Sequence, residues 1–167
     1  RNMVRNVLKD GLALEQTTGT NPFKMGFIGS TDTHSATPGG AEEDNYVGHL
    51  GRRDAGYRNV QDQFFDNQGG LAVVWAEENS RDSIFEGMRQ REVYATSGTR
   101  PIVRFFAGEH YAAELCSDPQ MIEKAYAGGV PMGSELEAFA ASPTFLVSAA
   151  KDAGSRGHPG LDLQRIQ

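Results

Sequence analysis

Two short apolar runs, each followed at once by polar residues, constrain the fold of this chain more than any other feature. The runs cover residues 25–30 and 71–76. Short apolar runs of this kind are typical of strands buried on both faces of a parallel sheet. In parallel α/β folds the functional groups sit at the carboxyl ends of the strands. The polar residues after the two runs are therefore the first candidates for a functional site.

Helical patterns lie close to both runs. Residues 2–15 carry apolar side chains at nearly helical spacing, and Ser80 is suited to cap a helix that reaches Arg91. Between residues 35 and 70 small and polar residues dominate, which predicts a long irregular excursion. We therefore expect an α/β architecture for residues 1–99.

The pattern changes after Gly98. Residues 101–107 and 143–149 are rich in the aromatic and β-branched residues that favour strands, whereas residues 120–127 suit a strand or a short helix equally well. We place a boundary at residues 99–100. The β-rich extension that follows covers residues 100–167, and we expect it to be truncated.

Composition excludes several classes of protein. The formal net charge is −6, with 16 basic and 22 acidic residues, and no Lys or Arg cluster stands out, so we expect no nucleic-acid partner. No apolar run reaches the ~20 residues of a membrane span. The single cysteine, Cys116, cannot form an internal disulfide or a thiolate zinc site. The chain starts without Met and reads as a fragment, so a periplasmic or secreted location would require a signal upstream of Arg1.

Asp32 and His34 are the strongest candidates for a functional pair. They follow the first apolar run and are two residues apart, so on an extended segment both side chains point the same way. A carboxylate and an imidazole are common ligands of zinc, manganese and iron in hydrolytic sites. His49, in the same polar excursion, is a third candidate ligand. The alternative interpretation is an Asp-Thr turn with a solvated histidine.

Four further residues are candidates for catalysis or substrate binding. Glu77 and Glu78 follow the second apolar run, where either could serve as a general base or orient a metal ligand, or simply form a charged approach to the next helix. Ser97 and Arg100 could recognise an anion, because an arginine offers a planar fork to phosphate or carboxylate. A salt bridge between the two parts of the chain would explain Arg100 equally well. No phosphate-binding loop, dinucleotide fingerprint or serine nucleophile elbow is present.

Four strings of the sequence resemble a bacterial family of unknown function. They cover residues 26–34, 41–44, 70–79 and 94–100, and the resemblance extends over residues 1–150. This family looks related to the PHP (polymerase and histidinol phosphatase) metallohydrolases. The resemblance implies the C-terminal part of a distorted α/β barrel with a multi-metal site, followed by a β-rich segment. The last Asp-x-His motif of PHP enzymes falls on Asp32 and His34, and the earlier ligands would lie upstream of Arg1.

These observations predict a fragment of a metal-dependent hydrolase that acts on phosphoester bonds of a small-molecule substrate. A metal-bound hydroxide would be the nucleophile, and the fragment by itself would be inactive. Two alternatives stay open. One is a binding or structural module that recognises surface or carbohydrate ligands through the β-rich part, and the other is an amidohydrolase-type enzyme that cleaves C–N or C–O bonds.

Overall fold

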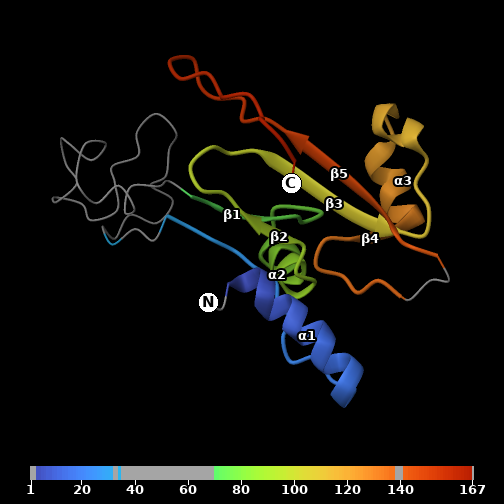
Figure 1. Cartoon of the computed structure of the whole chain (residues 1–167). Helices are drawn as coiled ribbons and strands as arrows, with labels where there is room; N and C mark the ends of the chain where they lie inside the picture. Colours follow the sequence, from blue (N-terminus) through green and yellow to red (C-terminus); the bar gives the residue numbers. More distant parts are fainter. Residues whose placement is uncertain (1–2, 32–33, 35–69, 138–140, 167) are drawn as a thin grey trace.

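The structure of the chain is a computed structural model, and it describes residues 3–31, 34, 70–137 and 141–166 (Figure 1). The described residues combine helices with two small sheets, and they form no closed barrel. The helices are α1 (Val4–Thr18), α2 (Arg81–Arg89) and α3 (Met121–Gly128), with a 3₁₀ turn at Ala113–Ser117. The strands are β1 (Ala72–Val74), β2 (Val93–Ala95), β3 (Ile102–Gly108), β4 (Gly129–Pro131) and β5 (Thr144–Ala150).

Both expected helices before residue 99 are present. α1 ends at Gly19, whose φ of 75° lies in the left-handed region that favours glycine. α2 begins after Ser80, and the Ser80 hydroxyl accepts a hydrogen bond from the Ser83 amide, as an N-cap should. None of the helices in the described ranges is long and apolar enough to cross a membrane.

The prediction of a parallel sheet is wrong for the strands that the structure describes. β1 pairs antiparallel with β2, and Val73 lies opposite Tyr94. The physical reason is that α2 packs closely against the end of β1, so the chain enters β2 beside the point where it left β1. A carbon added at Gly87 would lie 2.4 Å from the carbonyl oxygen of Trp75, the residue after β1. The helix therefore sits at the end of a wide hairpin instead of crossing the sheet face. The Trp75 amide already donates to the Glu92 carbonyl at 3.0 Å.

Residues 25–30 are extended but belong to no strand, which corrects the prediction of a buried strand. Met25, Phe27 and Ile28 are 45%, 38% and 59% exposed, because no second layer of described residues covers them. The segment still follows β2 in the same direction. Carbons added at Gly26 and Gly29 would lie 2.8 Å and 3.0 Å from the Cβ atoms of Arg91 and Ala95.

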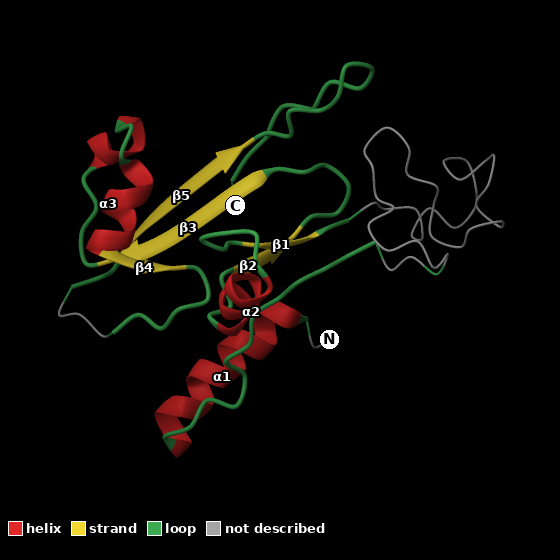
Figure 2. Cartoon of the chain, turned by 180° about the vertical axis from the view of Figure 1, so that it is seen from behind, coloured by secondary structure: helices red, strands yellow, loops and turns green. Residues whose placement is uncertain are grey.

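The second sheet has the strand order β4-β3-β5, and all its pairs are antiparallel. β3 and β5 confirm the strands predicted at 101–107 and 143–149, and α3 settles residues 120–127 as a helix. α3 lies against one face of this sheet (Figure 2). There Phe106, Leu146, Ala125 and Tyr111 form the buried core.

The approach of α2 to β1 leads to a test of the fold. Gly87→Ala should lower the free energy of unfolding by ~1–3 kcal/mol, because the new methyl group has no room beside Trp75 and Val74. The loss should appear despite the higher helix propensity of alanine. Urea unfolding followed by fluorescence of Trp75, the single tryptophan, would measure it. In the matched control Gly157→Ala the added carbon meets nothing within 4 Å, so equal effects of the two substitutions would contradict this packing.

Candidate functional site

One edge of the first sheet gathers the segments that the sequence marked as functional. A carbon added at Gly70 would lie 2.5 Å from the Thr96 carbonyl oxygen and 3.3 Å from that of Ser30. Thr96 also pairs with Leu71, because its amide donates to the Leu71 carbonyl at 3.0 Å and its hydroxyl accepts from the Leu71 amide at 2.9 Å. The chain therefore leaves the described part and re-enters it beside the end of β2 (Figure 1). We call the surface around Ser30, Gly70 and Thr96 the strand-end edge.

The predicted metal ligands are only partly within the described structure. Asp32 and His49 lie outside the described residues. His34 is described, and it is exposed. It is four residues after Ser30, which lies at the strand-end edge.

The predicted anion-binding residues belong to the loop that leaves this edge. Ser97 directly follows Thr96 and is exposed, whereas Arg100 is half-buried. The Arg100 amide donates to the Asp152 carboxylate at 2.6 Å. The loop from Thr96 to Arg100 is thus held at both ends, by Leu71 on one side and by Asp152 on the other.

Asp152 was missed by the sequence analysis. It is 7% exposed, and its carboxylate accepts from the Gly154 amide at 2.8 Å as well as from Arg100. An aspartate two residues before a glycine is a turn signal that could have marked the local bond. The bond to Arg100 joins residues 52 positions apart, and no local pattern encodes it.

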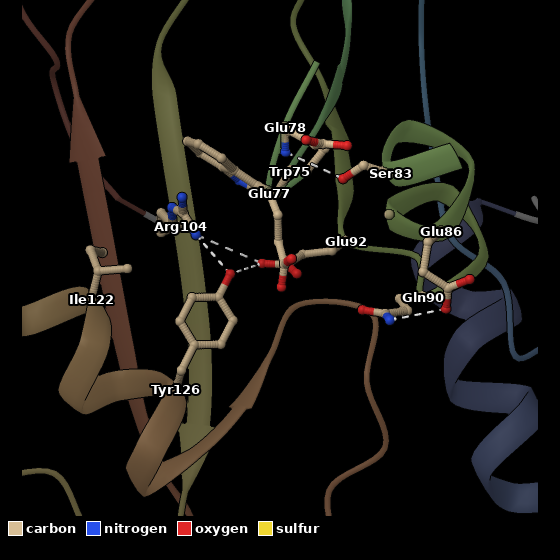
Figure 3. Close-up of a pocket in the computed structure, with 12 residues that line it drawn as sticks. Trp75, Glu77, Glu78, Ser83, Glu86, Gln90, Glu92, Arg104, Ile122 and Tyr126 are labelled. Carbon is tan, nitrogen blue, oxygen red and sulfur yellow. Dashed lines mark hydrogen bonds and ion pairs between the residues drawn. The ribbon is translucent and has the colours of Figure 1, made fainter. Parts of the chain in front are cut away.

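Glu77 and Glu78 lie away from the strand-end edge. Both follow the end of β1, and β1 runs antiparallel to β2, so they lie beyond the opposite end of this sheet. There they line an open pocket of about 800 Å³ (Figure 3). The other residues that line it come from β1, α2, β2, β3 and α3 or their flanks: Trp75, Ala76, Ser83, Glu86, Gly87, Gln90, Glu92, Arg104, Ile122 and Tyr126.

Arg104 is the centre of the polar network in this pocket. Its guanidinium carbon lies 3.5 Å from the centroid of the Trp75 ring, which is a cation–π contact. Its Nη1 donates to the Tyr126 hydroxyl at 2.7 Å and lies 3.8 Å from Oε1 of Glu92. The Tyr126 hydroxyl in turn donates to the same Glu92 oxygen, as Figure 3 shows. Sequence reasoning assigned none of these residues to a site, because they are brought together from segments far apart in the chain.

The main chain places the Glu92 carboxylate inside this network. Arg91, just after α2, has a φ of 62°, and this left-handed residue ends the helix and turns the chain into β2. Glu92 is consequently only 8% exposed. A buried carboxylate is costly unless it is paired, and here Tyr126 and Arg104 provide the pairing.

Partial burial of Tyr126, followed by its hydrogen bond to Glu92, raises the pKa of its phenol to about 12. The hydroxyl is therefore a fixed proton donor at neutral pH. Within the described ranges, no group of three or more His, Cys, Asp or Glu side chains is arranged to hold a metal ion. The pocket thus offers hydrogen bonds and charge to a ligand.

Comparison with known proteins identifies the family. All 167 residues match the family described as "Protein of unknown function (DUF3604)", and the chain belongs to it. An uncharacterized protein of Chlamydia trachomatis serovar D is 43% identical over 53 residues, which are 29% of this chain and 8% of that relative. The chain therefore matches only a small part of the relative's length. No solved structure matches the chain.

The raised pKa of Tyr126 predicts how stability depends on pH. A group whose pKa is raised in the folded state contributes stability below its unfolded pKa, ordinarily 10. That contribution is lost as the pH rises through the folded value of about 12. Tyr126→Phe should destabilise the protein by ~1–3 kcal/mol at pH 7, because Glu92 loses a buried donor. It should also lose less stability than the unmodified chain between pH 10 and pH 12.

Urea unfolding at pH 7, 10 and 11 would measure both effects. Glu92→Gln is the informative companion, since it removes the charge and keeps an acceptor for the Tyr126 hydroxyl. If Tyr126→Phe and the unmodified chain lost stability in parallel above pH 10, the hydroxyl would not be coupled to Glu92 as the structure indicates.

Proposed function

We propose that this chain is part of a metal-dependent hydrolase in which Asp32 and His34 bind the metal, and that the enzyme cleaves phosphoester bonds. One observation carries the proposal. Ser30 and Thr96 both lie beside Gly70, so the strings that contain His34 and Ser97 both pass the same edge. Those are two of the strings by which the chain resembles the bacterial family that looks related to the PHP metallohydrolases. Functional groups of α/β enzymes also gather where strands end.

The donor types fit a divalent ion such as zinc, manganese or iron, but the described residues do not complete a site. His34 supplies an imidazole, and Asp32 would add a carboxylate. Catalytic zinc sites use three protein ligands, and no described cluster offers three donors. The proposal therefore requires further ligands, for which His49 is the candidate within this chain. A metal bound there would supply an acidified water as nucleophile.

The loop from Ser97 to Arg100 is the proposed binding element for the substrate phosphoryl group. Ser97 is exposed next to the strand-end edge, and Asp152 holds the Arg100 backbone in place. A serine hydroxyl and an arginine fork both bind phosphate oxygens. Glu77 and Glu78 have no part in this proposal, because they lie beyond the opposite end of the sheet.

Metal analysis of the full-length protein tests the ligand assignment. Asp32→Ala and His34→Ala should each reduce metal affinity by at least ~10- to 100-fold, which is the typical loss when a residue that only supports a metal ligand is removed. Titration of the metal-free protein with zinc or manganese would measure the change. His110→Ala, which removes another exposed histidine, is the matched control and should bind metal normally. Unchanged affinity in both ligand variants would refute the assignment.

The same preparations separate the reaction classes. A panel of p-nitrophenyl phosphates, esters and amides should show metal-dependent turnover of the phosphates. Turnover of amides or esters alone would instead indicate an amidohydrolase-type enzyme, which also uses metal-activated water.

We propose ligand binding in the pocket around Arg104 as a second candidate function. The pocket combines aromatic side chains with planar carboxylate, amide and guanidinium groups, a set that can hydrogen-bond the hydroxyls of a carbohydrate. Glu77 and Glu78 are exposed in it, and no hydrogen bond or ion pair joins their carboxylates to another described residue. They are thus available to a ligand without breaking the network of Arg104.

A glycan array with the whole chain, with and without a chelator, tests this second function. Binding should persist in the chelator and should fall at least ~10-fold in Glu77→Gln, which corresponds to a lost charged hydrogen bond. Glu109→Gln, an exposed glutamate outside the pocket, is the control. The absence of any chelator-resistant binding would exclude the pocket as a carbohydrate site of this kind.

A further inference from the structure

The outer edge of β5 is an unusually open strand edge. β5 pairs with β3 along its full length, from Thr144 opposite Gly108 to Ala150 opposite Ile102. On its other side, no backbone hydrogen bond from the described part of the chain reaches it. Proteins usually protect such edges with charges, prolines, bulges or short strands. β5 has seven residues, unbroken register and no charge or proline. Figure 2 shows it as the outermost strand of its sheet.

The face of this sheet opposite α3 is also uncovered and apolar beside that edge. Phe105, Phe145 and Val147 share this face, and the first two rings stack with centroids 5.6 Å apart. Their exposed fractions are 37%, 59% and 36%. An additional strand along β5 would extend the sheet and bring its own side chains against this surface.

The chain after β5 already turns back in an antiparallel register. Ser155 and His158 exchange backbone hydrogen bonds of 2.8 Å and 3.2 Å around a two-residue turn. Gly154 bridges Pro159, and the Lys151 ammonium lies 2.7 Å from the Asp162 carboxylate. All three pairs belong to the same antiparallel register: each residue earlier on the first arm lies opposite a residue one position later on the second arm. Figure 1 shows this arm leaving β5 and doubling back.

Continuing the register specifies the next cross-strand pairs. Leu163 would face Ala150 and Arg165 would face Ser148, while Ile166 would face Val147 on the open apolar face. In the structure, residues 161–166 belong to no strand, and Leu163 and Ile166 are 46% and 63% exposed. The pairing would cover both apolar side chains together with the exposed surface of β5.

We propose that the outer edge of β5 is a strand-docking site and that its occupant is the chain's own segment 163–166. The choice of occupant follows from the hairpin, because its turn, its bridge and its ion pair set the register before docking begins. An intramolecular strand also has a far higher effective concentration than a second copy of the chain. Docking forms a fourth strand in this sheet and removes an edge that would otherwise pair with other molecules.

Cysteine cross-linking tests the register directly. The cysteine pair is Ser148→Cys with Arg165→Cys, introduced into a Cys116→Ser background. In the proposed register these two residues lie directly opposite each other, so both thiols are on the same face of the sheet. Oxidation of the dilute protein should form an intrachain disulfide, identified by peptide mass spectrometry. The control is Ser148→Cys with Gln164→Cys, whose side chains point to opposite faces if the register holds. The in-register pair should give at least ~10-fold more intrachain product.

A second substitution separates specific docking from simple proximity. Adding Ile166→Asp to the in-register pair should abolish its advantage, since a carboxylate would then face Val147. In the unmodified chain, hydrogen exchange should show protected amides on both edges of β5. Interchain disulfides would assign the edge to a second copy, and equal yields from the two cysteine pairs would show that the segment does not dock. Either outcome overturns the proposal.

Discussion

The contacts of the Arg104 guanidinium hold the two sheets in their arrangement. The guanidinium stacks on Trp75, which follows β1, and donates to Tyr126 on α3, so a single side chain from β3 touches both halves of the molecule. Glu92, the residue before β2, completes the contact. The Trp75 indole also donates to the Val103 carbonyl at 3.1 Å. These bonds are partly shielded from water, where charge-assisted hydrogen bonds and cation–π contacts are strongest.

The two sites of the molecule follow from this junction and from the antiparallel hairpin of β1 and β2. One end of the hairpin faces the junction and forms the pocket with Glu77 and Glu78. The other end gathers Ser30, Gly70 and Thr96, where the proposed metal site begins. A hairpin thus separates residues that a parallel sheet would have brought to one edge. This is why Ser30, which ends the first apolar run, and the two glutamates, which follow the second, lie at opposite ends of the hairpin.

The elements predicted correctly are those whose signals are local. α1 and α2 follow from helical spacing and the Ser80 cap, and β3 and β5 follow from runs of aromatic and β-branched residues. The wrong predictions concern which segments pair with or cover one another. An apolar run such as 25–30 signals burial, but the residues that would cover it are not encoded in the run itself. In the described structure its side chains stay exposed.

By itself the sequence determined the family and the local helices and strands. Metal binding by Asp32 and His34 stays a prediction. Only the tertiary structure decided the direction of β2, the pocket around Arg104 and the buried role of Asp152. The physical reason is the distance along the chain over which each interaction acts. Capping, periodicity and turn propensity act over a few residues, whereas the bond from Arg100 to Asp152 and the contact of Arg104 with Trp75 join distant segments. Such contacts exist only once packing has brought those segments together.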